Sequence, residues 1–493
     1  MRRVLLVFLV SALTVAIESC STIERLTWGT PPLEQFRSNI DAVLSDSIFT
    51  PAKCGIKIVS LDNNEVLYER DAQMLLRPAS NMKLITAATA LSALGKNFLF
   101  KTEIYSDTLI RDSVLHGNIY LKGFGDPDFN SAQLTDLLST LKTRGIARIE
   151  GNIVGDVSYF DDERWGAGWM WDDEPSGFAA YNSALSINRN CVEVTVTASN
   201  NLGDTALVSV DPQTHYVSLL NDATTDADTA ALTLEISRKF KERLNVITVK
   251  GKIPRGAKPQ KEAVSVWDPE MYFLTLVKEE LQRQNIFFDG KILFDTIPSA
   301  AALVARHYQP IDSMVVFLNK MSDNLSAENT LKILGAEEYG IPGTTEHGIS
   351  VVKRVLNTFN IDTAKFLMVD GSGVSHYDLV TPEIFVDLLR GIYSRKDFFD
   401  LYYSSLPNAG VDGLLASRMK GTSAQYNLHA KTGTLSGVST LSGYVRTTEG
   451  EMLAFSIMMQ NYIGTGEPYR KSQDEVGALM AGFSRKKGPS KQK

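Results

Sequence analysis

The run Arg77-Pro78-Ala79-Ser80-Asn81-Met82-Lys83 opens a segment rich in alanine and leucine that ends before Gly95. Alanine and leucine are strong helix formers and glycine often ends a helix, so the sequence predicts a helix over 80–94. Residues three apart share a helix face, which brings the Ser80 hydroxyl and the Lys83 amine within hydrogen-bonding reach. A serine beside an amine at a helix N-terminus is a candidate nucleophile with its base.

Ser-x-x-Lys is a weak signal by itself, because it recurs at Ser139, Ser350, Ser417, Ser484 and Ser490. Two further motifs strengthen it. Ser322-Asp323-Asn324 precedes a helical pattern and could alternatively be only a helix cap. Lys431-Thr432-Gly433-Thr434 lies on a predicted strand, and the alternative here is an ordinary strand with a glycine bulge.

Around these motifs the two ends of the chain mix helices and strands. Helices are expected over 32–45, 324–339, 382–394 and 472–483, and strands over 55–61, 66–69, 427–435, 438–446 and 452–461. The middle differs, because period-two alternation at 192–196, 232–236 and 246–249 predicts short strands. We expect a signal peptide over 1–20, one domain split between 21–101 and 301–484, inserted β-rich domains over 102–300, and a solvated basic tail over 485–493.

The order of the three motifs resembles that of the penicillin-binding proteins and β-lactamases. The surrounding residues resemble the class C low-molecular-mass penicillin-binding proteins, the penicillin-binding protein 4 type of D-alanyl-D-alanine carboxypeptidase/endopeptidase. They are the runs 77–83, 123–127, 322–325, 370–373, 409–413 and 430–435. His376 departs from the arginine that is frequent there. The resemblance implies an α/β fold of the mixed α+β kind, with an antiparallel sheet between helices on both faces, split by a β-rich insertion.

The resemblance also implies a mechanism and a substrate. Ser80 would attack a D-Ala-D-Ala peptide or a β-lactam, with Lys83 as base and Ser322 relaying the proton. A free lysine titrates near 10.4, so Lys83 must be neutralised by burial and by the nearby cation Lys431.

Substrate contacts are expected from Asn324, Lys431, Thr432, Gly433 and Thr434, and backbone N–H groups of Ser80 and Thr434 would hold the oxyanion. Asp126 would bind the amino end of a peptidoglycan side chain; the alternative is a turn aspartate before Pro127. No metal or cofactor is implied.

Composition and motifs give little support to other classes. The 493 residues carry 50 Lys plus Arg against 57 Asp plus Glu, a net charge of −7, and show no basic stripe for nucleic acid. Neither Gly-x-Ser-x-Gly nor His-Glu-x-x-His occurs. The rival functions are a serine β-lactamase and a non-enzymatic penicillin sensor or envelope-binding module.

The N-terminus predicts export. Arg2 and Arg3 precede an apolar run over 4–17 that is too short to span a membrane and is typical of a signal peptide for transport to the periplasm or cell envelope. Cys20 ends a lipobox-like sequence and is a possible lipid anchor; cleavage without lipidation is the alternative. Outside the cytoplasm, Cys54 and Cys191 could form a disulfide.

Overall fold

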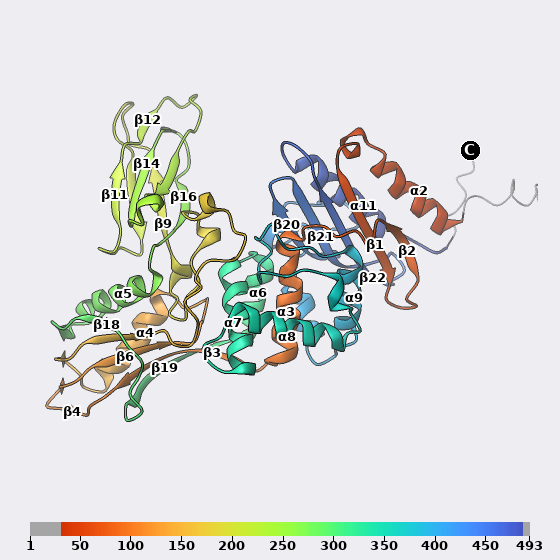
Figure 1. Ribbon diagram of the computed structural model, residues 1–493. Helices are drawn as coiled ribbons and strands as arrows, with labels where there is room; N and C mark the ends of the chain where they lie inside the picture. Colours follow the sequence, from red (N-terminus) through yellow and green to blue (C-terminus); the bar gives the residue numbers. More distant parts are fainter. Residues whose placement is uncertain (1–30, 487–493) are drawn as a thin grey trace, which may run out of the picture.

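A computed structural model describes residues 31–486, and its central feature is a five-stranded antiparallel sheet (Figure 1). Its strand order is β2 (Val66–Arg70), β1 (Lys53–Ser60), β22 (Met452–Gln460), β21 (Val438–Arg446) and β20 (His429–Leu435). The two ends of the chain meet where β1 pairs along its whole length with β22. The predicted fold class, a mixed antiparallel sheet and helix protein, is confirmed.

Helices cover both faces of this sheet. Helices α2 (Pro32–Leu44) and α11 (Glu467–Ala481) pack together over one face, and α9 (Pro382–Tyr393) packs against the other. Strand β22 is buried throughout and sends alternate side chains into two cores. Phe455 and Ile457 join the core under α2 and α11, whereas Ala454 and Met458 join the core under α9. Burial on both faces explains why this strand is apolar at nearly every position.

Beyond α9 lies a layer of helices that carries two of the motifs. It contains α3 (Met82–Ala93), α6 (Ile311–Lys320), α7 (Asn324–Tyr339), α8 (Thr345–Thr358) and α10 (Phe399–Ser405). Helix α7 is buried from Asn324 to Ala336 and packs against α3, α6 and α8. The motif serines therefore stand at the ends of helices that tertiary packing holds rigidly.

The middle of the chain forms a separate lobe joined by two neighbouring strands. Strand β3 (Leu99–Ser106) leaves the helical layer and β19 (Ala302–Pro310) returns beside it, antiparallel to β3. Together they belong to the sheet β18 (Ile292–Phe294), β8 (Ile153–Asp156), β6 (Ile119–Gly123), β3, β19, which packs with α4 (Ser131–Thr143) and α5 (Pro269–Arg283). A small sheet of β17 (Phe287–Phe288), β7 (Arg148–Ile149), β5 (Val114–Leu115) and β4 (Ile110–Arg111) adjoins it.

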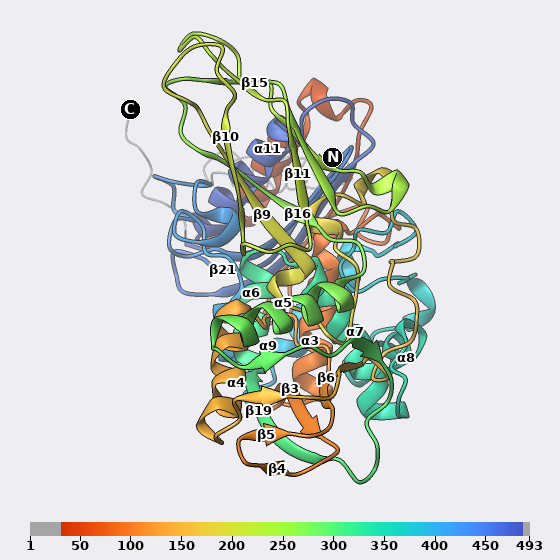
Figure 2. The same ribbon diagram turned by 90° about the vertical axis from the view of Figure 1, so that its left-hand side faces the viewer.

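The far part of this lobe is made of β-strands (Figure 2). The first sheet contains β10 (Leu207–Asp211), β9 (Cys191–Thr197) and β16 (Gln260–Ser265). The second contains β11 (Ser218–Asn221), β14 (Val246–Lys250) and β13 (Glu235–Arg238). The third pairs β12 (Thr224–Asp226) with β15 (Lys252–Pro254). Strands were predicted correctly at 192–196 and 246–249. The strand expected over 232–236 begins only at Glu235, because the Gly251 and Lys252 backbone contacts Thr233 outside the ladder.

Several other expectations need correction. The last helix begins at Glu467 rather than Ser472, since Pro468 occupies its first turn, where a missing N–H costs nothing. Cys54 and Cys191 are both free, buried thiols. Arg485 is not simply solvated, because it forms ion pairs with Glu65 and Glu451.

Within residues 31–486 no helix is long and apolar enough to cross a membrane. The predicted signal peptide and Cys20 lie outside the described residues.

Candidate active site

Ser80 and Lys83 lie together at the start of α3. A 3-10 turn over Ala79–Asn81 runs directly into the helix, and Ala79 takes a left-handed backbone conformation with φ of 46°. Such a conformation is unfavourable for a residue with a side chain and is typically found where function requires it. The Lys83 Nζ donates to Ser80 Oγ at 3.0 Å, as the three-residue spacing predicts.

The Lys83 amine is completely buried and has two further acceptors. It donates to Asn324 Oδ1 at 2.5 Å and to the Ser372 carbonyl at 2.8 Å. Burial lowers the pKa of Lys83 to about 8, although the charges of Asp370 and Glu328 oppose this shift. An amine with this pKa is partly neutral near pH 7, and it can therefore accept a proton from the neighbouring hydroxyl.

Lys431 and Ser322 form a second amine–hydroxyl pair. The Lys431 Nζ donates to Ser322 Oγ at 2.8 Å and to the Thr432 carbonyl at 2.9 Å. Burial, and then the positive charge of Lys83, hold the pKa of Lys431 well below its usual range. The expectation for Lys83 was that burial and the neighbouring cation together lower its pKa. Burial is the main cause at both lysines, and repulsion between the two amines adds to it at Lys431.

Asn324 is the first residue of α7, and both ends of its amide are engaged. Its Oδ1 accepts from Lys83, and its Nδ2 donates to the Phe178 carbonyl at 2.7 Å. The neighbouring Asp323 caps the helix by accepting from the Ser326 backbone N–H at 2.7 Å. The Ser-Asp-Asn motif therefore does contain a helix cap, but its serine and asparagine also contact the two lysines.

Strand β20 passes directly beside Ser80 because Gly433 has no side chain. A Cβ at position 433 would stand 2.2 Å from Thr440 Oγ1, 2.8 Å from the Pro78 carbonyl oxygen and 3.0 Å from the Ser80 backbone nitrogen. Strand β20 pairs with β21 in unbroken register, so Gly433 is not a bulge. It permits close approach of the strand to the serine.

A cavity of about 540 Å³ opens above Ser80. Ser80, Ser322, Asn324, Thr432 and Thr434 line it, whereas Lys83 and Lys431 lie behind its surface. Other lining residues were not predicted from the sequence. They are Met170, Asp172, Asp173 and Phe178 from the inserted lobe, and His376 and Leu414 from later segments. The position of His376 was noted only as a departure from arginine. Its Nδ1 lies 3.2 Å from the Arg77 guanidinium.

Asp126 is not brought to this cavity. It is 1% exposed, and its Oδ1 accepts from the Asp128 backbone N–H at 3.0 Å, which is the geometry of a turn aspartate. Its Oδ2 is buried without a hydrogen-bond partner. Burial raises the pKa of Asp126 to about 7.

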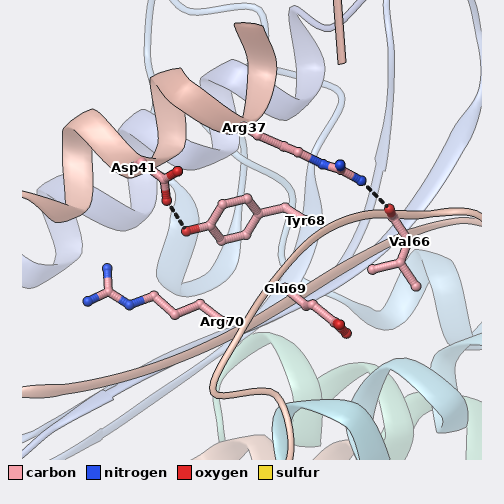
Figure 3. A pocket seen from close by; sticks show the side chains of 6 residues that line it. All are labelled: Arg37, Asp41, Val66, Tyr68, Glu69 and Arg70. Carbon is pink, nitrogen blue, oxygen red and sulfur yellow. Dashed lines mark hydrogen bonds between the residues drawn. The ribbon is translucent and has the colours of Figure 1, made fainter. Parts of the chain in front are cut away.

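A second, shallower pocket lies between α2 and β2 (Figure 3). Tyr68 donates to Asp41 at 2.6 Å, and Arg37 donates to the Val66 and Leu67 carbonyls. These contacts attach α2 to the edge strand of the sheet, and none of the three motifs lines this pocket. In residues 31–486 no group of three or more His, Cys, Asp or Glu side chains is placed to hold a metal ion.

Comparison with known proteins identifies the family. The model of the D-Ala-D-Ala carboxypeptidase 3 (S13) family matches residues 36–482. The chain belongs to the S13 family. The D-alanyl-D-alanine carboxypeptidase of Actinomadura sp. (strain R39) is 34% identical to this S13 protein over 93% of this chain and 86% of that protein. The D-alanyl-D-alanine carboxypeptidase DacB of Haemophilus influenzae is 29% identical over 84% and 86% of the two chains.

Solved structures agree with this S13 assignment. The crystal structure of penicillin-binding protein 4 (dacB) from H. influenzae matches with a TM-score of 0.80 and 27% identity, covering 90% of this chain and all of that chain. A second structure of that protein, complexed with a β-lactam, has a TM-score of 0.74 at 25% identity. The family resemblance is confirmed, and the chain is a serine-type D-Ala-D-Ala carboxypeptidase that binds β-lactams. As an S13 protein it is an exported protein of the cell envelope.

Proposed function

We propose that Ser80 forms the acyl-enzyme when the chain cleaves D-Ala-D-Ala ends of peptidoglycan peptides, with Lys83 as its general base. The observation that carries this proposal is the 3.0 Å hydrogen bond from a buried, pKa-lowered amine to a hydroxyl that lines the cavity. The carbonyl of the penultimate D-alanine would be attacked, and backbone N–H groups of Ser80 and Thr434 would stabilise its oxyanion.

Ser322 is the proposed route for the proton to the leaving amine. Its hydroxyl lines the cavity and accepts from Lys431, so it lies between the solvent-accessible site and a buried amine. The terminal carboxylate would contact the Thr432 and Thr434 hydroxyls, which also line the cavity. Lys431 would act from behind them, because a bound carboxylate favours the ammonium form of a nearby lysine.

The acidic wall supports a substrate with a free amine. Asp172 is exposed and Asp173 half-buried, and both line the same cavity as Ser80. We propose that they attract the ammonium group of a diamino acid in the stem peptide, a role that the sequence analysis gave to Asp126. In a cross-linked peptide the stem whose D-alanine carbonyl is attacked can keep its own side-chain amine, so the same contact would also accept cross-linked substrates. Endopeptidase cleavage of cross-bridges therefore forms part of the proposal.

Penicillin labelling tests the nucleophile. The purified chain and a Ser80→Ala variant are incubated with penicillin and the acylated peptide is located by mass spectrometry; a label on Ser80 alone is expected. Purified peptidoglycan fragments then separate the activities, since released D-alanine reports carboxypeptidase and a split cross-bridge reports endopeptidase. Rapid penicillin hydrolysis without D-alanine release would indicate a β-lactamase, and a stable acyl-enzyme without either product would indicate a sensor.

The route of export is proposed separately. Arg2, Arg3 and the following apolar run would direct secretion, and a lipidated Cys20 would anchor the mature protein to a membrane. Fractionation of cells that express the native chain and a Cys20→Ser variant tests the anchor. The native chain should sediment with membranes and the variant should not; native protein wholly in the soluble envelope fraction would contradict lipidation.

A further inference from the structure

Glu328, on α7, lies behind Lys83. It follows Asn324 by four residues, so the two side chains leave the same face of the helix. Its side chain is buried and accepts three backbone contacts from one loop. The Gly371 N–H lies 3.0 Å from each carboxylate oxygen, and the Ser372 N–H lies 2.7 Å from Oε1.

The same loop provides an acceptor for Lys83. The Ser372 carbonyl accepts a hydrogen bond from Lys83 Nζ at 2.8 Å. Ser372 therefore bonds to both groups, because its own N–H donates to Glu328. Thr86, one turn after Lys83 on α3, donates to the Gly371 carbonyl at 2.6 Å. The loop is therefore fixed between α3 and α7, with the charged contact on the α7 side.

Other ionisable groups face this cluster. Asp370 accepts from the Trp169 indole at 2.8 Å and from the Gly373 and Ser375 N–H groups at 2.7 Å. Burial and the charge of Asp370 raise the pKa of Asp378 well above its usual range, which favours its neutral form. Burial, followed by the charge of Asp370, raises the pKa of Glu328, whereas its backbone donors and Lys83 favour its ionised form. The charge of Asp323 opposes the lowered pKa of Lys83, and the charge of Lys83 lowers the pKa of Lys431.

We propose that Glu328 is a positioning residue for Lys83. Through the backbone of Gly371 and Ser372 it holds the carbonyl that orients the amine toward Ser80, and its negative charge adjusts the amine's affinity for a proton. This inference rests on the proposed role of Lys83 as base. It gives a reason for a carboxyl group at a buried position where an apolar side chain would cost less to bury.

The rate of penicillin acylation against pH tests the two parts of the proposal. In Glu328→Gln the carboxylate is lost, so the ammonium form of Lys83 is less stabilised and the pH midpoint of acylation should fall. The fall should be at most about one unit, because burial raises the pKa of Glu328 to about 8 and leaves it only partly ionised near neutral pH. Thr86→Val is the matched control, because it removes a neutral contact to the same loop. It should slow acylation without moving the midpoint.

A third variant, Glu328→Asp, separates charge from reach. It keeps the charge but withdraws the carboxylate from the loop. We therefore expect acylation to slow about tenfold, less than the roughly 10²–10⁴-fold that loss of the base itself costs, with the midpoint unchanged. Should Glu328→Gln fail to fold, as thermal unfolding would show, this variant alone decides the positional part. A midpoint that moves equally in Thr86→Val, or wild-type acylation rates in Glu328→Asp, would overturn the inference. Absence of acylation in the wild type would instead overturn the proposed function itself.

Discussion

The two walls of the cavity differ in almost every physical respect. The inner wall comes from α3, α7 and β20, where Lys83 and Lys431 are fully buried and joined to hydroxyl groups by hydrogen bonds. The outer wall comes from the inserted lobe, where the side chains of Met170 and Phe178 are 48% and 51% exposed. A buried, hydrogen-bonded wall suits chemistry that must be the same for all substrates. An open, acidic wall suits discrimination between substrates.

The walls are nevertheless connected by two hydrogen bonds. The Asn324 amide donates to the Phe178 carbonyl, and the Trp169 indole donates to Asp370 in the cluster behind Lys83. Both bonds are buried or half-buried, and they tie the inserted segment to the catalytic residues. Substitutions on the inner wall should therefore affect every substrate, whereas substitutions of the free side chains on the outer wall should affect only some.

The largest effect is expected from Lys83→Met. Methionine keeps most of the buried stem but has no amine, so Ser80 loses its proton acceptor. Loss of a positioned base typically costs about 10²–10⁴-fold, and penicillin and peptide should lose rate equally. Stopped-flow acylation and D-alanine release measure the two rates, and thermal unfolding checks the fold. A rate close to that of the wild type with either substrate would exclude Lys83 as the base.

The pH dependence of acylation should follow the same amine. Because burial lowers the pKa of Lys83 to about 8, its neutral form decreases as the pH falls below that value. The acylation rate should therefore fall about tenfold for each pH unit below the pKa, and it should level off above it. Rates measured with penicillin between pH 5 and 10 provide the midpoint. A rate that is still rising at pH 10, as expected for the free-lysine pKa of about 10.4, would show that burial does not lower the pKa of Lys83.

These inner residues were predictable from sequence because each stands in a short, local motif. The helix at 382–393 was also found almost to the residue, since Thr381 and Pro382 form a recognisable start. Helix α5 was not predicted although Asp268 and Pro269 give a comparable start, because it lies between the short strands of the inserted lobe. The outer wall had no such signal. The segment from Trp169 to Phe178 forms only short 3-10 turns, and its partners Asp370 and Asn324 lie far away in the sequence.

Asp126→Asn tests whether this buried carboxylate, which does not line the cavity, is structural. Because burial raises its pKa from 3.8 to about 7, the folded state binds its proton more tightly than the unfolded state does. Stability should be fully present below about pH 4 and decrease as the pH rises to about 7, at about 1.4 kcal/mol for each pKa unit. Asp126→Asn should remove this part of the decrease while peptide and penicillin rates stay alike. A selective loss of peptide cleavage would restore the substrate-binding role.

Gly433→Ala tests the closeness of β20 to Ser80. The added methyl group would overlap Thr440 Oγ1 and the Pro78 carbonyl, so the strand must move away from the serine. Overpacking of this kind typically costs about 1–3 kcal/mol, and acylation should slow by roughly tenfold with both substrates. Denaturant unfolding and acylation rates measure the two effects. Gly256→Ala, in the inserted lobe where the nearest atom to the added Cβ would be a flexible side-chain oxygen 3.5 Å away, is the control for an unrelated glycine.

The smallest and most selective effect is expected on the outer wall. Neutralising Asp172 and Asp173 by Asp→Asn substitution removes their attraction for an ammonium group, and partly exposed charge pairs contribute only about 0–1 kcal/mol each. The kcat/KM for a peptide with a free diamino-acid amine should fall a few-fold. Penicillin acylation, and cleavage of the same peptide with its amine acetylated, should hardly change. Asp162→Asn, on an exposed residue of the same lobe outside the cavity lining, should leave all three rates unchanged. Equal losses with all substrates would mean that the acidic residues support the inner wall, and the division between a chemical and a selective wall would fail.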